Sequence, residues 1–251
     1  MQVLEHDSGS FRFIEGIVPY SGGVAATSGH EVVWATFRHP RPLRQGIARA
    51  AEVADTEGLG PSSVCAFALR SPGQMDLDAF AELNATYRQL LAEFDVLHDD
   101  PNPIARTNVI PYPAPPSEPL VHGFAYVRSA PAADRTTFVI AGAAEIRTKP
   151  LDLDAVVRPG DTSPEALVEK ADQVLETMGR RLQALGLGWD RVTTVDLYVR
   201  HDVAVDLAAR LAAPLGEGAL HGVRWFPSGP PIAGLDFEMD VRGVAVERFI
   251  D

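Results

Sequence analysis

Residues 163–200, SPEALVEKADQVLETMGRRLQALGLGWDRVTTVDLYVR, hold the pattern of a helix, a tight turn and a strand. From 164 to 185, apolar side chains recur at steps of three and four, which is typical of a helix with one apolar face. A Thr-Ser pair before Pro164 can cap this helix, and the Gly-Leu-Gly at 186–188 can end it. The β-branched run at 192–199 then predicts a strand.

The same plan occurs earlier in the chain. Residues 49–70 contain a shorter helix, a second Gly-Leu-Gly at 58–60 and an apolar strand at 64–69. The two turns are 186 − 58 = 128 residues apart, about half of the 251-residue chain. A second helical pattern follows each copy, at 78–94 and at about 203–215. We therefore predict two similar halves.

Strand and loop signals fill the remainder of each half. Extended segments are expected at 11–17, 32–37, 106–110, 120–127, 137–142, 223–226 and 236–246, and loops at 38–44, 111–119 and 227–234. Along 236–246 the apolar and charged side chains alternate, so they point to opposite faces of the strand. The expected fold class is α/β, an α+β sandwich in which each half is a mixed sheet with two helices on one face.

The short polar segment 130–135 is the predicted boundary between the halves, giving domains at 1–129 and 136–251. Each such domain would leave one sheet face uncovered. An uncovered face predicts self-association into a homo-oligomer, most simply a trimer. Alternatively, the two halves can pack these faces against each other within one chain.

Composition narrows the classes of partner. The net charge of −12 argues against a nucleic-acid surface, but a few arginines can still form a local site for a small anion. Cys65 is the only cysteine and the histidines lack metal-ligand spacing, so no disulfide, metal or other cofactor is expected. The N-terminus lacks a signal-peptide core and no stretch is long enough to span a membrane, which favours a cytoplasmic protein.

Short motifs in order along both halves resemble those of the Rid family, the YjgF-type reactive intermediate (enamine/imine) deaminases. In the first half they are Pro19-Tyr20-Ser21, the Asn84-x-x-Tyr87 pattern and Ala105-Arg106-Thr107. In the second half they are the strand ending at Ala141-Gly142, Pro159-Gly160-Asp161, the segment 184–195, Val223-Arg224 and the closing strand 238–245. A tandem arrangement of such chorismate mutase-like domains also resembles the chorismatases.

This resemblance implies sites in clefts between domains, where an arginine binds the substrate carboxylate and an acid on the closing strand activates water. The implied activity is hydrolysis of an enamine or imine on a small unsaturated amino or imino carboxylate, such as 2-aminomuconate, with release of ammonia. One alternative is a chorismatase-like lyase or hydrolase acting on an enol ether. Another is a non-catalytic protein that binds a small ligand.

The second half is expected to carry the working site. Its Arg224 is the predicted carboxylate clamp and its Asp240 the predicted proton-transfer group, because the first half has Val121 and Gly123 where an acid would lie. The predicted substrate-binding residues are Arg106, Asn108, Tyr20, Tyr87 and Trp225. The competing interpretations are a surface arginine at 224, a salt bridge from Asp240 to Arg242 or Arg224, and packing roles for the aromatic residues.

Overall fold

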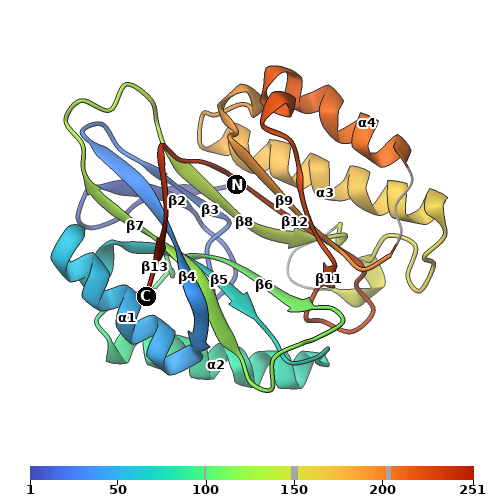
Figure 1. Cartoon of the computed structure of the whole chain (residues 1–251), viewed down its shortest axis with the longest axis horizontal. Helices are drawn as coiled ribbons and strands as arrows, with labels where there is room; N and C mark the ends of the chain where they lie inside the picture. The colour runs from blue at the N-terminus through green and yellow to red at the C-terminus, as the bar shows by residue number, and fades with distance from the viewer. Residues whose placement is uncertain (99, 148–151, 202–204) are drawn as a thin grey trace.

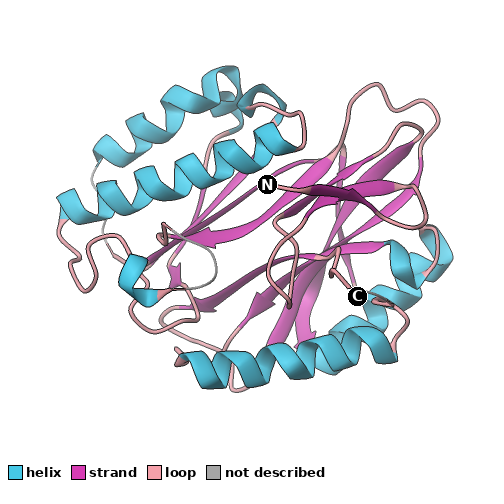
Figure 2. Cartoon of the chain, turned by 180° about the vertical axis from the view of Figure 1, so that it is seen from behind, coloured by secondary structure: helices cyan, strands magenta, loops and turns pink. Residues whose placement is uncertain are grey.

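The computed structural model describes residues 1–98, 100–147, 152–201 and 205–251, and within them it has four layers. Two sheets pack face to face, and a pair of helices covers the outer side of each (Figures 1 and 2). α1 (Leu43–Glu57) and α2 (Leu77–Glu93) cover one sheet, and α3 (Pro164–Ala184) and α4 (Val205–Leu215) cover the other. The mixed α+β architecture with two helices per sheet confirms the predicted fold class.

The sheet below α1 and α2 has six strands and the sheet below α3 and α4 has seven. The first has the order β11 (Ser228–Gly229), β6 (Ala105–Pro111), β5 (Val64–Arg70), β7 (Leu120–Ser129), β4 (His30–Pro42) and β13 (Val246–Ile250). The second has the order β1 (Val3–Glu5), β2 (Phe11–Ile14), β3 (Gly23–Ala26), β8 (Phe138–Ala144), β12 (Phe237–Gly243), β9 (Thr194–Val199) and β10 (Arg224–Phe226). Short 3-10 turns cover Pro61–Ser63, Leu153–Ala155, Trp189–Arg191 and Gly216–His221.

The centres of the two sheets repeat one pairing pattern. β6 runs parallel to β5 while β7 runs antiparallel to it, and in the other sheet β10 is parallel and β12 antiparallel to β9. Arg106 lies opposite Phe67 in the first parallel pair, and Arg224 lies opposite Asp196 in the second. These two arginines therefore lie on corresponding strands of the two halves.

Both ends of the chain cross to the other half's sheet. β3 pairs with β8, so β1, β2 and β3 extend the second sheet, while β11 pairs with β6 and β13 with β4 in the first (Figure 1). Residues 130–137 connect β7 in one sheet to β8 in the other. The segment predicted as the joint is therefore a crossing between sheets, and the chain ends form two further crossings.

Three segment predictions were wrong. The segment 227–234, predicted as a loop, contains the short strand β11, which pairs with β6. Residues 38–44 form no loop: β4 continues to Pro42 past a register shift between Thr36 and Arg41, and α1 begins at Leu43. Pro40 and Pro42 fit there because β13 pairs with β4 only as far as Phe37, so these prolines break no ladder on that side. The closing segment is also two strands, because the chain leaves β12 at Gly243 and crosses over to form β13.

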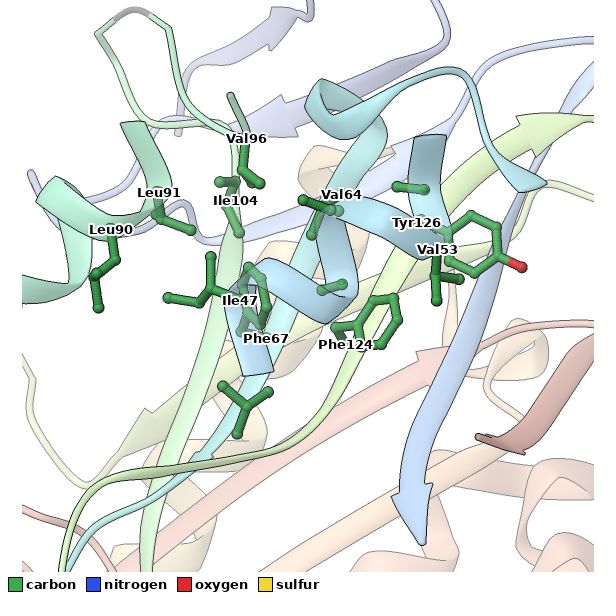
Figure 3. Close-up of a cluster of buried hydrophobic side chains, with 14 of the residues drawn as sticks. Ile47, Val53, Val64, Phe67, Leu90, Leu91, Val96, Ile104, Phe124 and Tyr126 are labelled. Carbon is green, nitrogen blue, oxygen red and sulfur yellow. The ribbon is translucent and has the colours of Figure 1, made fainter. Parts of the chain in front are cut away.

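Three apolar layers hold the sandwich together. One lies between α1, α2 and the first sheet and includes Ile47, Leu91, Phe67 and Phe124 (Figure 3). A second lies between α3, α4 and the second sheet. The third lies between the sheets and is rich in small side chains, including Ala66, Ala68, Ala105, Ala125 and Ala141. The uncovered sheet faces thus pack against each other within the chain, which is the alternative that the sequence left open. None of the described helices is long and apolar enough to cross a membrane.

Candidate active site

A cavity of about 290 Å³ lies at the contact between the two halves. From the first half it is lined by residues that include Tyr20, Ser21, Gly22, Phe80, Arg106 and Asn108. From the second half the lining includes Gly142, Arg147, Arg180, Arg181, Ile232, Leu235 and Glu238. A compartment of this size, with a few polar groups in an apolar wall, suits a small organic ligand.

Arg106 projects from β6 and is the buried cation on the first-half side, with 3% of its surface exposed. Its Cζ atom lies 4.5 Å from the ring centroid of Tyr20, 4.9 Å from that of Tyr87 and 5.6 Å from that of Phe80. These rings hold the guanidinium in place by cation–π contact. Its Nη1 has no hydrogen-bond partner among the described residues. A desolvated donor without a partner is costly, so this one is suited to a ligand anion.

Glu238 is the acid on the second-half side, on β12, and it is 6% exposed. Burial raises the pKa of Glu238 to about 8, and the negative charge of Asp240 adds to the shift while Arg106 opposes it. Burial dominates because it disfavours the ionised form. The carboxyl group is therefore mostly protonated at neutral pH and can donate a proton.

Gly142 on β8 lets Glu238 reach this position. A Cβ atom built at Gly142 would overlap the Glu238 carboxyl oxygen Oε1 and would lie 3.0 Å from the Cγ2 atom of Thr107. The Gly142 N–H donates to Thr107 Oγ1 at 3.1 Å, which joins β8 of one sheet to β6 of the other. A glycine is required here because two side chains occupy the space that any Cβ would need.

A buried ion-pair network fixes the start of the strand that carries Glu238. The Glu145 carboxylate accepts the N–H of Asp236 at 2.7 Å and that of Phe237 at 3.2 Å. Lys170 of α3 is fully buried and donates to Asp236 Oδ2 at 2.5 Å. Each of these groups is both paired and buried, so the network positions β12.

The cavity is electropositive although the chain as a whole is acidic. Arg181 of α3 is 5% exposed, whereas Arg147 and Arg180 are exposed, and all three line the cavity with Arg106. Asn108 accepts the Ser71 hydroxyl on its Oδ1 at 2.9 Å, which leaves its Nδ2 without a partner among the described residues. Such a lining favours an anionic ligand.

The structure brings together only part of the predicted site. Tyr20, Arg106 and Asn108 line the cavity, and Tyr87 lies behind Arg106 with its ring against the guanidinium. Trp225 is 42% exposed on the edge strand β10, and its indole N–H donates to the Val199 carbonyl at 3.3 Å, outside the cavity lining.

The predicted pair Arg224 and Asp240 also lies outside the cavity lining. Arg224 donates from Nε and Nη2 to the two carboxylate oxygens of Asp196, at 2.6 and 3.0 Å. Asp240 is buried and accepts the Tyr198 hydroxyl at 2.9 Å. The geometry therefore favours a different assignment, in which the first half supplies the arginine and the second half supplies the acid.

Glu238, Gly142 and Arg181 are among the cavity residues that the sequence analysis did not name as candidates. Glu238 shares a face of β12 with Asp240, two residues away, so the alternation pattern could have named it as readily. Gly142 ends the Ala141-Gly142 motif, but the sequence indicated no role for it. Arg181 follows Arg180 in a helix, and the sequence does not distinguish which of the two is buried.

One family model and one curated relative match nearly the whole of this chain. The model of the family described as "2-aminomuconate deaminase CnbZ" matches residues 3–248. A 2-amino-5-chloromuconate deaminase of Comamonas testosteroni is 37% identical over 249 residues, covering 96% of each chain. A chorismatase crystal structure has a TM-score of 0.54 and 16% identity, over 89% of this chain and 77% of that one. The YjgF gene product of E. coli has a TM-score of 0.29 and 14% identity, over 43% and 80%.

Proposed function

Because this chain belongs to the 2-aminomuconate deaminase CnbZ family, we propose that it hydrolyses the enamine of a 2-aminomuconate-type acid and releases ammonia. A 2-aminomuconate is a six-carbon diene with a carboxylate at each end and an amino group beside one of them. One observation carries the proposal. A buried guanidinium without a partner among the described residues shares a cavity with a carboxylic acid whose pKa is about 8.

Binding starts at Arg106. The carboxylate next to the amino-bearing carbon replaces the missing partner of Nη1, and a guanidinium can hold a carboxylate through two parallel hydrogen bonds. The rings of Tyr20 and Tyr87 keep the fork from turning. The enamine is thereby held in the same compartment as Glu238.

Protonation of carbon is the first chemical step. The protonated Glu238 donates its proton to the far carbon of the enamine double bond, whose π electrons form the new C–H bond. The nitrogen lone pair then forms a C=N bond, which gives an iminium ion and leaves Glu238 ionised. An acid with a pKa near the working pH is suited to this transfer and to the return transfer that follows.

Water completes the reaction. It adds to the iminium carbon while the Glu238 carboxylate takes one of its protons, which gives a neutral carbinolamine. Glu238 then protonates the nitrogen, the C–N bond breaks, and the hydroxyl proton returns to Glu238 as the C=O bond forms. The balance is enamine plus water giving a keto acid plus ammonia, with Glu238 protonated again at the end.

The test is to incubate the purified protein with 2-aminomuconate and to follow ammonia release together with loss of the dienamine absorbance. The proposal predicts equal amounts of ammonia and keto acid. Pyruvate released from chorismate, with no ammonia from 2-aminomuconate, would favour the chorismatase-like alternative. Binding of 2-aminomuconate without turnover would favour the non-catalytic one.

Predictions about organisation remain proposals. The tandem Rid-like repeat, with domains at 1–129 and 136–251, is supported by the pairing pattern that β5, β6 and β7 share with β9, β10 and β12. The cytoplasmic location rests on the sequence.

The trimer was predicted from uncovered sheet faces, and the packing of these faces within the chain removes that reason. Exposed Leu220 and Trp225, at or near β10, still support a contact between copies. Light scattering that gives the mass of one chain at micromolar concentration would exclude the trimer.

A further inference from the structure

The cavity contains a second buried arginine that the mechanism above does not use. Arg181 lies in the last turn of α3, and among the described residues it has no carboxylate within ion-pair distance. Its Nη1 donates to the carbonyl of Ala141 at 2.7 Å and to that of Gly142 at 3.3 Å. Two neutral carbonyls orient the guanidinium but leave its charge uncompensated.

The remaining donors of Arg181 have room for a ligand. Its Nε is buried without a hydrogen-bond partner among the described residues. A Cβ atom built at Gly22, which also lines the cavity, would lie 3.7 Å from that Nε. A side chain at position 22 would therefore crowd this donor further, whereas Nη2 of Arg181 is not among the buried atoms and has no hydrogen-bond partner among the described residues.

Glu238 lies within electrostatic reach of both arginines. Its charge raises the pKa of Arg106 and of Arg181, although burial lowers both by more. Burial raises the pKa of Tyr20, and the positive charges of the same two arginines partly oppose this shift. The acid, the tyrosine and the two guanidinium groups thus form one cluster, contributed by β6, β12, α3 and the loop before β3.

We propose that Arg181 binds the second carboxylate of the substrate and so selects dicarboxylates over monocarboxylates. This inference rests on the proposed function, because Arg106 is assigned the carboxylate beside the reacting carbon. A dicarboxylate held at both arginines would lie in the same cavity as Glu238. A monocarboxylate would leave one buried guanidinium unpaired, which is the arrangement by which polar sites reject incomplete ligands.

The test compares two unreactive ligands that differ by one group. Muconate and sorbate are both six-carbon dienes, with two carboxylates and one carboxylate respectively, and their binding is measured by calorimetry. The wild-type protein is expected to bind muconate at least tenfold more tightly than sorbate. Arg181→Met is expected to remove this preference by weakening muconate binding alone. Arg106→Met is expected to weaken both ligands.

A matched control separates the site from the fold. Arg12 also donates from its Nη2 to a backbone carbonyl, that of Leu185 at 2.7 Å, and its Nε also has no partner among the described residues. It is not among the residues that line the cavity. Arg12→Met is therefore expected to lower the melting temperature without changing the ratio of muconate to sorbate affinity.

The outcomes distinguish a failure of the role proposed for Arg181 from a failure of the proposed function. If Arg181→Met does not fold, Arg181→Lys replaces it, because a lysine can still donate to the Ala141 carbonyl but lacks the Nε donor, so the preference should shrink. An unchanged preference in the folded variant overturns the role of Arg181, as does a wild-type protein that binds neither ligand. Failure of the proposed function has a separate sign, which is the absence of ammonia when wild-type protein meets 2-aminomuconate.

Discussion

Arg106 and Arg224 lie on corresponding strands of the two halves, β6 and β10, yet their environments are opposite. The residue across the parallel strand pair is Phe67 for Arg106 and Asp196 for Arg224. Phe67 has no carboxylate to offer, and Arg106 keeps a buried donor without a hydrogen-bond partner among the described residues. Asp196 binds Arg224 through two hydrogen bonds and also accepts Arg242 Nη1 at 2.9 Å. An arginine that recurs in both halves can therefore bind a ligand only where the neighbouring strand leaves its charge unpaired.

The two buried acids of β12 also differ, because one lines the cavity and the other does not. Glu238 and Asp240 lie on one face of β12, but only Glu238 lines the cavity. Burial raises the pKa of Asp240 to about 6, and hydrogen bonds from Thr107 and Tyr198 oppose the shift. Asp240 is therefore the more acidic of the pair, and its charge helps to keep Glu238 protonated.

The largest effect is expected from Glu238→Gln. Glutamine keeps the size of the side chain but cannot donate and recover a proton, so kcat for ammonia release should fall roughly 1,000-fold. Muconate binding by calorimetry should stay within about threefold, because the arginines are unchanged. A variant that retains a tenth or more of the wild-type kcat would break the assignment of Glu238.

Next in size is Arg106→Lys, which keeps the charge and loses the fork. We expect kcat/KM to fall roughly 30- to 800-fold, which corresponds to a loss of about 2–4 kcal/mol of transition-state binding. Steady-state kinetics with 2-aminomuconate measures it. A loss of less than threefold would mean that no carboxylate is held by Arg106.

A smaller loss is expected from Gly142→Ala. The new methyl group would occupy the space of the Glu238 carboxyl oxygen and displace it. Since small displacements of a reacting group can cost up to 100-fold, kcat should fall between about 10- and 100-fold. Gly73→Ala is the control, because a Cβ atom there meets nothing within 4 Å. Equal kinetics in the two variants would count against the close fit of Glu238.

The smallest effect is expected from substitution of the arginine on the corresponding strand of the second half. Arg224→Lys should change kcat/KM by less than about threefold, because Arg224 is outside the cavity lining. The Arg224 side chain is 45% exposed, so its pair with Asp196 should contribute no more than about 1 kcal/mol to stability. Thermal melts and kinetics on the same sample measure both. A loss as large as that of Arg106→Lys would return the site to the second half.

Local signals in the sequence were enough for the helices and for part of the site. The helices and the Gly-Leu-Gly turns follow from three- and four-residue periodicity and from turn residues, which act over short distances. Arg106 and Tyr20 were named from short motifs, and Asn108 from its place two residues after Arg106 on one strand. All three line one cavity.

The crossings and the acid depend on long-range packing. The alternation over 236–246 indicates one extended segment, but it shows neither the break after Gly243 nor the pairing of β13 with β4 in the other half's sheet. The same alternation places Glu238 and Asp240 on one face, and only the way the two sheets stack determines which of them reaches the cavity. Arg180 and Arg181 differ in burial for a similar reason, since the packing of the end of α3 separates them.

The pH dependence of kcat/KM in wild-type protein and in Asp240→Asn tests most directly whether Glu238 is the acid and Asp240 its neighbour. Because protonated Glu238 is the active form, wild-type activity should fall as the pH rises through about 8. Removing the charge of Asp240 lowers the pKa of Glu238, so the variant should remain active while this alkaline limb moves to lower pH. Loss of turnover in Asp240→Asn, or an alkaline limb that does not move, would contradict the account.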